Sequence, residues 1–479
     1  MASAKTGGDA KADNDIVNAF KLDTNQVFQK DRNVRCAPDT GQWFFHHPEY
    51  ESFRAAKGLQ LLFVTAEAGG GKSTVMRTLV DRLQDSDAPR SVVAYFFFKD
   101  DDDQLRSYED ALSSMIYQLF IQERGLIKHA RNLYKQYGHG IRYQTKELWT
   151  ILLAAATETH RELVCVLDAA DECAPAGRRQ LVSDLAVAFK SGANRTTKLK
   201  FVVTSRPYQD ENHPYANLIA SDTIRHLAGE DARVQSDIQS IIRFKAEELA
   251  KKYRLAQNTL DILVEAISSQ NLQTRSFMAV RMAFELLDSH DLMHEGAGED
   301  IIRAILADIP QTLGDQFDKM LDRSLDKEHA RRLFCVILAA RKTLRIPELK
   351  VLYALTQPRD PTAEPPQSYA DLQLPADDDE FKRLIRAQCG SFITFVRSSV
   401  HLFHQTAREY LMANLNTTNT DSPEGKLMPT TSNSIAGREK DLQRTWRGCI
   451  TKSDANLIML TACMDLFNFK IPKSWVLQV

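Results

Sequence analysis

The sequence lacks paired cysteines, a surplus of basic residues and long apolar runs. Its seven cysteines are scattered singly with no C-x-x-C pair, which argues against a disulfide framework and a structural zinc site. The 61 basic residues are matched by 63 acidic ones, so no broad positive surface for nucleic acid is expected. The start, MASAKTGGDAKADND, has no apolar signal-peptide core, and no apolar run approaches the roughly 18 residues of a membrane span. These absences favour a cytoplasmic protein with small-molecule and protein partners.

What is present is the composition of a globular protein, with 43% hydrophobic and 26% charged residues. At roughly 150 residues per domain, the length allows about three domains. Helical spacing predicts a helix at 73–83 and another that begins after Ser107, with Asp110 completing its cap. Short apolar runs between the helical patterns predict strands within 59–65, 91–98, 163–172 and 198–207. Alternating strands and helices predict an α/β fold with a mostly parallel sheet.

After about Leu227 the strand patterns stop and helical periodicity takes over. Between 312 and 414, helices are followed by a Val/Phe/Ile-rich hairpin, a pattern typical of a winged helix. Stretches rich in Pro, Ser, Thr and Asp in the C-terminal half predict flexible loops. The expected organisation is a polar N-terminal tail at 1–35, an α/β domain at 36–230, a helical domain at 231–311, a winged-helix domain at 312–414, a flexible linker at 415–437 and the start of a further helical region at 438–479.

A Gly-rich stretch, TAEAGGGKST, differs by one residue from the phosphate-binding loop G-x-x-x-x-G-K-[ST], because Ala66 replaces the first glycine. It lies between an apolar strand and a helix, and a helix presents free N–H groups and its dipole to phosphates. An alanine at position 66 costs roughly 1 kcal/mol only if a positive φ is needed there. A plain Gly-rich turn is the alternative. The residues predicted to bind nucleotide are Ala68, Gly69, Gly70, Gly71, Lys72, Ser73 and Thr74, with Lys72 reaching the β and γ phosphates and Ser73 ligating Mg²⁺.

Acidic residues follow the apolar strand of LVCVLDAADE. Asp168, at the strand end, is predicted to hold the magnesium shell opposite Ser73. Asp171 or Glu172 is predicted to orient the attacking water, with a solvated acidic turn as the alternative. Arg206, in VVTSRP, is a candidate γ-phosphate sensor or else a surface arginine. Two further acidic runs lack the ligand spacing of a metal site, and a solvated surface is the expectation for 100–103 and 377–380.

Together these motifs resemble the NACHT branch of the STAND NTPases, and in particular fungal NACHT and nephrocystin-like N-terminal domains. The resemblance includes TGQWFFHHPEYESF, AEAGGGKST, YFFF, VLDAADE, VVTSRP, ADIPQTLGDQFDKML and LRIPELKVLYAL, and it covers roughly 36–414. The α/β domain is accordingly expected to be a NACHT P-loop NTPase domain. Ala66 and Ala169 depart from the family pattern, where glycine is commoner, and they weaken the expectation of fast hydrolysis more than that of binding.

The resemblance implies a signalling switch in innate immunity, non-self recognition or programmed cell death. ADP, held with the help of a winged-helix histidine, keeps such proteins closed, and exchange for ATP opens them to self-associate; FHQTAREYL places His404 at that position. The cofactors implied are ATP or ADP with Mg²⁺, with GTP as an alternative, and any hydrolysis is expected to be slow. An unknown protein ligand would act through C-terminal repeats that are not evident here, so either a shortened chain or a core that lacks its repeats is expected. A turnover NTPase or nucleotide kinase, and a nucleotide-independent scaffold, remain the alternatives.

Overall fold

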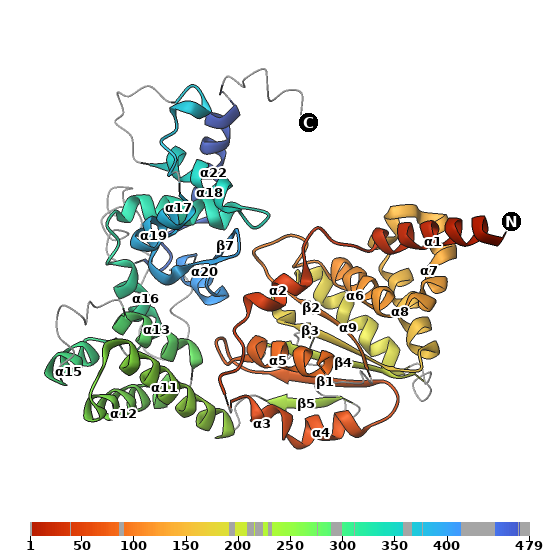
Figure 1. The fold of residues 1–479 in the computed structure, drawn as a ribbon, viewed down its shortest axis with the longest axis horizontal. Helices are drawn as coiled ribbons and strands as arrows, with labels where there is room; N and C mark the ends of the chain where they lie inside the picture. Colours follow the sequence, from red (N-terminus) through yellow and green to blue (C-terminus); the bar gives the residue numbers. More distant parts are fainter. Residues whose placement is uncertain are drawn as a thin grey trace, which may run out of the picture. The chain divides into compact units, whose positions relative to one another are not determined.

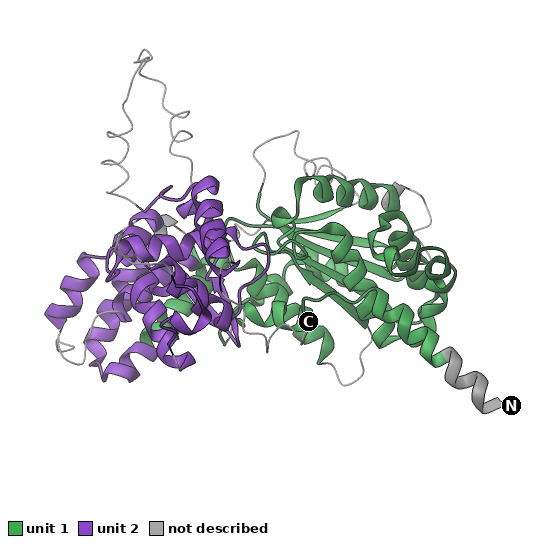
Figure 2. Cartoon of the chain, turned by 90° about the horizontal axis from the view of Figure 1, so that it is seen from above, with its two compact units in different colours: residues 1–247, 275–277 green, residues 248–274, 278–479 purple. Residues whose placement is uncertain are grey.

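The structure is a computed structural model, and two compact units can be distinguished in it (Figure 2). Unit 1 comprises Met1–Glu247 and Arg275–Phe277, and unit 2 comprises Glu248–Thr274 and Met278–Val479. The residues that the structure describes are 2–38, 40–85, 91–190, 197–207, 215, 224–228, 232–274, 276–288, 299–310, 312–357, 366–375, 377–412, 446–467 and 469.

Unit 1 is built on a parallel sheet with the strand order β2-β3-β4-β1-β5 (Figure 1). Each pair of neighbouring strands runs in parallel, and β3 lies between β2 and β4. The strands at the centre are almost continuously apolar and buried, as expected for a parallel sheet covered by helices on both faces. The predicted α/β class is therefore confirmed. The strand bounds are β1 Gln60–Thr65, β2 Ser91–Phe97, β3 Glu162–Asp168, β4 Leu199–Ser205 and β5 Arg225–Ala228.

Strand β5 is the element of the sheet that sequence periodicity does not predict. It pairs with β1 at the edge of the sheet. Of its residues only Leu227 is buried, so the segment RHLA carries neither an apolar run nor an alternating pattern. An edge strand that is buried on one side by a single residue has too little local signal to be recognised.

The helices of unit 1 surround this sheet. Ser107 caps α6 as predicted, since its side chain accepts a hydrogen bond from the N–H of Asp110 at 3.1 Å. The short η3 turn, Ala170–Glu172, follows β3 directly. The remaining bounds are α3 Gln42–Phe45, α4 Pro48–Ala55, α5 Lys72–Gln84, α6 Tyr108–Gln122, η1 Arg124–Ile127, α7 Lys128–Tyr137, η2 Gly138–Tyr143, α8 Thr145–Glu158 and α9 Pro175–Lys190, and α11, Ala232–Tyr253, contains the boundary between the units.

The N-terminal segment corrects the prediction of a polar tail at 1–35. It contains two helices, α1 (Ala2–Ala19) and α2 (Gln26–Arg32). A small apolar group at the end of α1 and directly after it belongs to the core of unit 1 and consists of Ile16, Val17, Ala19, Phe20 and Leu22. The average polarity of the segment conceals this group, because the buried residues are confined to the last turn of a long polar helix and the few residues after it.

In the described residues of unit 2, the structure shows helices and one antiparallel hairpin. The predicted hairpin is present, with β6 paired to β7 so that Ile393 lies opposite Leu402. Asp377 accepts a hydrogen bond from the N–H of Glu380 at 2.8 Å, so the acidic run 377–380 is the capped start of α19. The bounds are α12 Gln257–Thr274, α13 Phe277–Asp288, α15 Glu299–Ala307, α16 Leu313–Leu321, α17 Lys327–Ala339, α18 Ile346–Thr356, η5 Tyr369–Asp371, α19 Asp378–Cys389, η6 Gly390–Phe392, β6 Ile393–Val396, β7 Ser399–Leu402, α20 Gln405–Leu411 and α22 Lys452–Phe467.

The predicted linker 415–437 lies outside the described residues. Part of the predicted further helical region, 438–479, is described and forms α22. Among the helices in the described ranges, none has the length and apolar character that a membrane crossing requires.

Candidate functional site

The Gly-rich loop connects the end of β1 to the start of α5. Gly69 and Gly71 have φ values of 74° and 79°, a region that glycine adopts without steric cost. Gly71 is the N-cap of α5, and a Cβ atom at this position would lie 3.1 Å from Cε2 of Phe277. Both the backbone and the space around the loop therefore require glycine, and the free N–H groups of the first turn of α5 begin directly behind it.

Ala66 fits the loop without backbone strain. Its N–H donates to the carbonyl oxygen of Ser205 at 3.3 Å, and it is not among the described residues with a positive φ. Its side chain is buried. The condition under which an alanine would be costly at position 66 is therefore not met in this structure.

Lys72 is bound to the loop that precedes it. Its Nζ donates to the carbonyl oxygens of Ala66 and Glu67, the second at 3.0 Å. Burial lowers the pKa of Lys72, whereas the carboxylates of Asp171 and Asp168 act in the opposite direction. The pKa of this ammonium group is thus influenced by both carboxylates, which places all three side chains in one electrostatic neighbourhood.

Asp168 ends β3 and is fully buried. Its Oδ1 accepts a hydrogen bond from Thr204 Oγ1 at 2.6 Å, and Thr204 Oγ1 in turn accepts from the N–H of Ala169 at 2.9 Å. Among the described residues, Asp168 Oδ2 has no hydrogen-bond partner. A buried carboxylate oxygen without a partner is costly unless a cation or another donor compensates it. This donor set fits Mg²⁺, which binds through one or two protein oxygens together with phosphate and water.

The turn after Asp168 begins with Ala169 in the left-handed region, at φ 55° and ψ 48°. This conformation is uncommon for a residue with a Cβ atom. Asp171 then points toward the end of β4, where its Oδ2 lies 3.0 Å from Arg206 Nε. The backbone N–H of Arg206 also donates to Asp171 Oδ1 at 3.3 Å. Asp171 and Arg206, which the sequence predicted separately, are thus partners in an ion pair.

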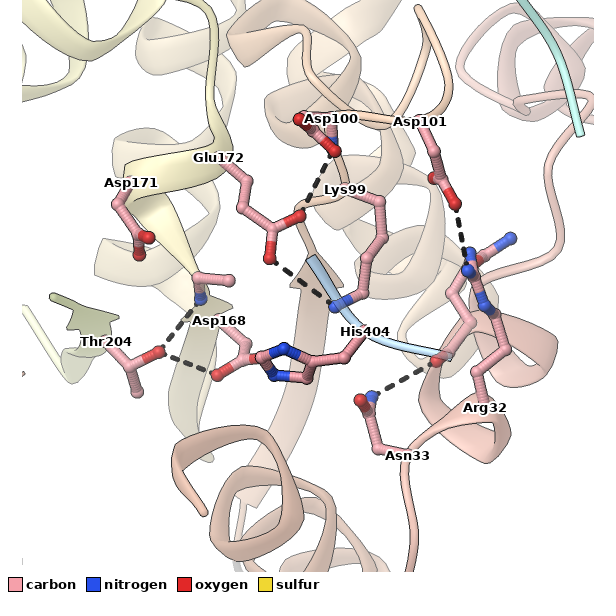
Figure 3. Close-up of polar contacts among 12 residues, drawn as sticks. Arg32, Asn33, Lys99, Asp100, Asp101, Asp168, Asp171, Glu172, Thr204 and His404 are labelled. Carbon is pink, nitrogen blue, oxygen red and sulfur yellow. Dashed lines mark hydrogen bonds and ion pairs between the residues drawn. The ribbon is translucent and has the colours of Figure 1, made fainter. Parts of the chain in front are cut away.

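Glu172 points to the opposite side, toward the end of β2 (Figure 3). Its Oε2 accepts the backbone N–H of Asp100 at 3.2 Å, and its Oε1 lies 3.7 Å from Lys99 Nζ. The Glu172 side chain is only 8% exposed. Burial raises its pKa from about 4.5 to about 8, with Lys99 acting in the opposite direction. At neutral pH this carboxyl is therefore mainly protonated.

The acidic run 100–103 corrects the expectation of a solvated surface. Asp102 is 5% exposed and its Oδ1 accepts the N–H of Gln104 at 2.9 Å. Lys99 N–H donates to the carbonyl oxygen of Leu105 at 3.1 Å, which closes the loop. The side chains of this run therefore fold the loop that contacts Glu172.

His404 belongs to unit 2 and is the N-cap of α20. Its Nδ1 accepts the N–H of Thr406 at 3.1 Å. Because Nδ1 acts as an acceptor, the neutral ring carries its proton on Nε2. The predicted junction between a strand and a helix is present, with β7 on one side and α20 on the other.

The predicted residues of unit 1 thus lie together at the carboxyl end of the sheet. Ser73 and Thr74 form the first turn of α5, half-buried, next to Lys72. Sequence reasoning missed Thr204, Lys99 and Arg32. Lys99 could have been found, since it directly follows an apolar strand, whereas Arg32 lies in the segment that was predicted to be a tail.

A Gly-rich loop between a parallel strand and a helix, beside a strand that ends in aspartate, defines the class of P-loop NTPases. Residues 39–206 match the family model of the nephrocystin 3 N-terminal domain. The chain is also 21% identical over 382 residues to the vegetative incompatibility protein HET-E-1 of Podospora anserina, an alignment that covers 78% of this chain and 26% of the relative. The chain therefore carries a nucleotide-binding, NACHT-like P-loop NTPase domain, and it spans about a quarter of the length of this relative.

Similar solved structures include the ORC2 protein of Aeropyrum pernix, at 12% identity and a TM-score of 0.33, which covers 82% of this chain and 94% of that one. Cdc6p of Pyrobaculum aerophilum shows 13% identity and a TM-score of 0.31, with coverage of 82% and 94%. These scores are too low to support a functional comparison.

Proposed function

We propose that this protein is a nucleotide-dependent switch that binds ATP or ADP with Mg²⁺ and hydrolyses the triphosphate slowly, with GTP as the alternative nucleotide. The observation that carries the proposal is the buried, unpartnered Oδ2 of Asp168, in the same electrostatic neighbourhood as Lys72 at the start of α5. A cation at Asp168 and phosphates at the N-terminus of α5 would satisfy both features.

The residues that would hold the nucleotide are distributed along the loop and the first turn of α5. The backbone N–H groups from Ala68 to Thr74 would donate to phosphate oxygens, and Lys72 Nζ would exchange its two carbonyl acceptors for β- and γ-phosphate oxygens. Ser73 and Asp168 would hold Mg²⁺, which stabilises negative charge on the transferring phosphoryl group. The protein would supply alignment and electrostatic stabilisation, which dominate catalysis of phosphoryl transfer.

The two candidate acids are proposed to have different roles. Asp171 acts electrostatically on Lys72 and is bound to Arg206, so we assign the orientation of the attacking water to Asp171 and contact with the γ-phosphate to Arg206. Glu172 is held under the loop after β2 and is mainly protonated, which suits a positioning role. Because Asp171 must leave at least part of its contact with Arg206 to bind water, slow hydrolysis is expected.

We also propose that residues 312–414 form a winged-helix domain, supported by the helices α16 to α19, the β6–β7 hairpin and α20. His404 would contact the bound diphosphate, because its Nε2–H is a donor in the neutral ring. Loss of this contact on exchange of ADP for ATP would open the protein to self-association. The name of the relative, a vegetative incompatibility protein, supports an output in fungal non-self recognition or cell death, triggered by a protein ligand.

The test is the identity of the nucleotide that remains bound to the purified full chain. We expect a stoichiometric adenine nucleotide, mainly ADP, and none in Lys72→Ala. Recovery of GDP would identify the alternative nucleotide. Protein that carries no nucleotide and binds none on titration with Mg²⁺-ATP, Mg²⁺-ADP or Mg²⁺-GTP would support the nucleotide-independent scaffold, and rapid steady turnover would support a constitutive NTPase.

A further inference from the structure

Helix α2 precedes the part of the chain that matches the family model, yet ion pairs attach it to the nucleotide domain. Asn25 caps its N-terminus by accepting the N–H of Val27 at 2.9 Å. Lys30 pairs with Asp81 of α5, and both side chains are largely buried. Arg77, also on α5, pairs with Asp31 at 3.2 Å. Helix α2 is therefore fixed to the helix that begins with Lys72.

Arg32, at the end of α2, contacts the loop after β2 (Figure 3). Its Nη2 lies 3.0 Å from Asp101 Oδ2, and the side chain is 9% exposed. Its Nη1 donates to Gln29 Oε1 at 3.0 Å, which orients the guanidinium group. A pair that is largely removed from solvent and geometrically fixed is worth more than an exposed one.

The loop from Lys99 to Arg106 contains Asp101 and also contacts the acidic turn after β3. Asp100 N–H binds Glu172 Oε2 at one end of that turn. The carbonyl oxygen of Arg106 accepts the N–H of Ala174, two residues after Glu172, at 2.9 Å. Arg106 N–H also donates to the carbonyl oxygen of Asp102 at 3.1 Å, so the loop is closed on itself and holds the C-terminal end of the turn and the residues that follow it.

We infer that Arg32 is a positioning residue for hydrolysis, acting through Asp101 and the loop 99–106 on Glu172 and thereby on its neighbour Asp171. This inference rests on the proposed hydrolysis of nucleotide. Docking of α2 on unit 1 is then a control of the hydrolytic rate, exerted from the N-terminal segment, and the affinity of the P-loop for nucleotide is largely independent of it. Arg32 also offsets part of the negative charge of the four consecutive aspartates at 100–103.

The experiment compares Arg32→Ala, Asp101→Ala and the charge swap Arg32→Asp/Asp101→Arg in the full chain. We expect kcat to fall about ten- to hundredfold in each single variant, the range expected when a catalytic group is misplaced. Nucleotide affinity should stay within about twofold, because a positioning defect acts mainly on the transition state. The charge swap should recover most of the rate, since it restores the pair with opposite polarity, and Arg32→Lys should recover part of it.

A second measurement does not depend on activity. Amide hydrogen exchange of the protein without added nucleotide should speed up in peptides covering 99–106 and 169–174 in Arg32→Ala. The matched control is Arg131→Ala, which breaks an exposed bidentate pair with Asp13 of α1. It should leave both the exchange of these peptides and kcat unchanged. Unfolding temperatures of all variants show whether the fold is retained.

Two results would overturn this inference but leave the proposed function standing. In the first, Arg32→Ala has the same kcat and the same amide hydrogen exchange as the parent protein. In the second, the charge-swap variant is stably folded but hydrolyses nucleotide as slowly as the single variants. A parent protein that binds nucleotide but never hydrolyses it overturns this inference together with the proposed hydrolysis. The two failures are therefore distinguishable.

Discussion

The adjacent acidic residues Asp171 and Glu172, in the turn after strand β3, have different partners on the two sides of that strand. On the β4 side, Asp171 pairs with Arg206 and acts electrostatically on Lys72. On the β2 side, Glu172 lies beside Lys99 and accepts the N–H of Asp100. The strand order β2-β3-β4 separates the pair, because the turn after a central strand can reach the ends of both neighbours. Adjacent acids in one motif therefore need not share a role.

The two sides also differ in what covers them. The β4 side leads to the P-loop and to ionic groups suited to phosphate and metal. The β2 side is covered by the loop 99–106, which Arg32 of α2 contacts, and burial there raises the pKa of Glu172. The first side is suited to ligand chemistry and the second to holding the turn in place.

The strongest test of this comparison removes the carboxylate on the β4 side. Asp171→Asn should lower kcat about 10²- to 10⁴-fold, the range for loss of a positioned acid or base. Glu172→Gln should lower it by much less, about tenfold, because it alters only the support of the turn. Single-turnover hydrolysis together with nucleotide titration checks this expectation. If Glu172→Gln is the slower variant, the assignment of the two acids must be reversed.

The substitution Lys72→Ala tests whether the β4 side binds nucleotide. Loss of a charge-assisted contact of roughly 1.5–3 kcal/mol should weaken nucleotide affinity by about 10- to 150-fold. The fold should persist, since Lys72 bonds only to loop carbonyls within the described structure. Calorimetric titration measures the change, with Lys57→Ala, an exposed lysine of unit 1, as the control. Equal affinities of Lys72→Ala and the parent would refute a phosphate-binding role for the loop.

On the β2 side, the raised pKa of Glu172 is tested by the pH dependence of the protein's stability. The folded-state pKa of Glu172 is raised to about 8, so between about pH 4.5 and 8 the native state holds a proton that the unfolded chain releases. Its contribution to stability is fully present below this window and is lost as pH rises through it, by at most about 1.4 kcal/mol per pH unit. Besides Glu172, the groups involved are Lys99, Asp100, Asp101 and Asp171.

Glu172→Gln should therefore flatten the fall in the free energy of unfolding across this window. Denaturant titrations of both proteins at several pH values, without added nucleotide, provide the measurement. Parallel pH profiles for parent and variant would contradict the raised pKa and, with it, the buried character of the β2 side.

The parts of the site that lie within one contiguous segment could be predicted from the sequence. The stretch TAEAGGGKST predicts the loop around Lys72 between a strand and a helix, and VLDAADE predicts a strand that ends at Asp168. The different partners of Asp171 and Glu172 could not be predicted, because they depend on which strands flank β3. Arg32 carried no signal, since its partner Asp101 is distant in the sequence and its helix lies in a polar segment. Strand β5, with one buried residue, was too short for periodicity.

His404 extends the comparison to unit 2, because it should distinguish two nucleotides that bind to the same P-loop. His404→Ala should weaken ADP more than ATP, by about 1–2 kcal/mol for one lost hydrogen bond, and raise the oligomeric fraction. Only such a difference in affinity can shift a two-state equilibrium. Its capping bond to Thr406 is a separate loss, so His404→Asn, which retains a capping acceptor, is the matched control. The ratio of ADP to ATP affinities and the mass distribution in solution are decisive; if neither moves, His404 is only a helix cap.

The smallest expected effects concern two alanines, Ala66 and Ala169, at positions where the family resemblance leads us to expect glycine. Ala169 lies on β3's acidic turn with φ 55°, so Ala169→Gly should relieve left-handed strain and stabilise the protein by about 1 kcal/mol. Ala66 is not among the described residues with positive φ, so Ala66→Gly should instead cost up to about 1 kcal/mol through the greater freedom of the unfolded chain. Denaturant midpoints of the two variants should thus move in opposite directions. Shifts of the same sign would mean that backbone conformation does not govern these positions, and that the methyl group of Ala66, which would lie 3.2 Å from a Cβ atom at Gly70, shapes the loop by packing instead.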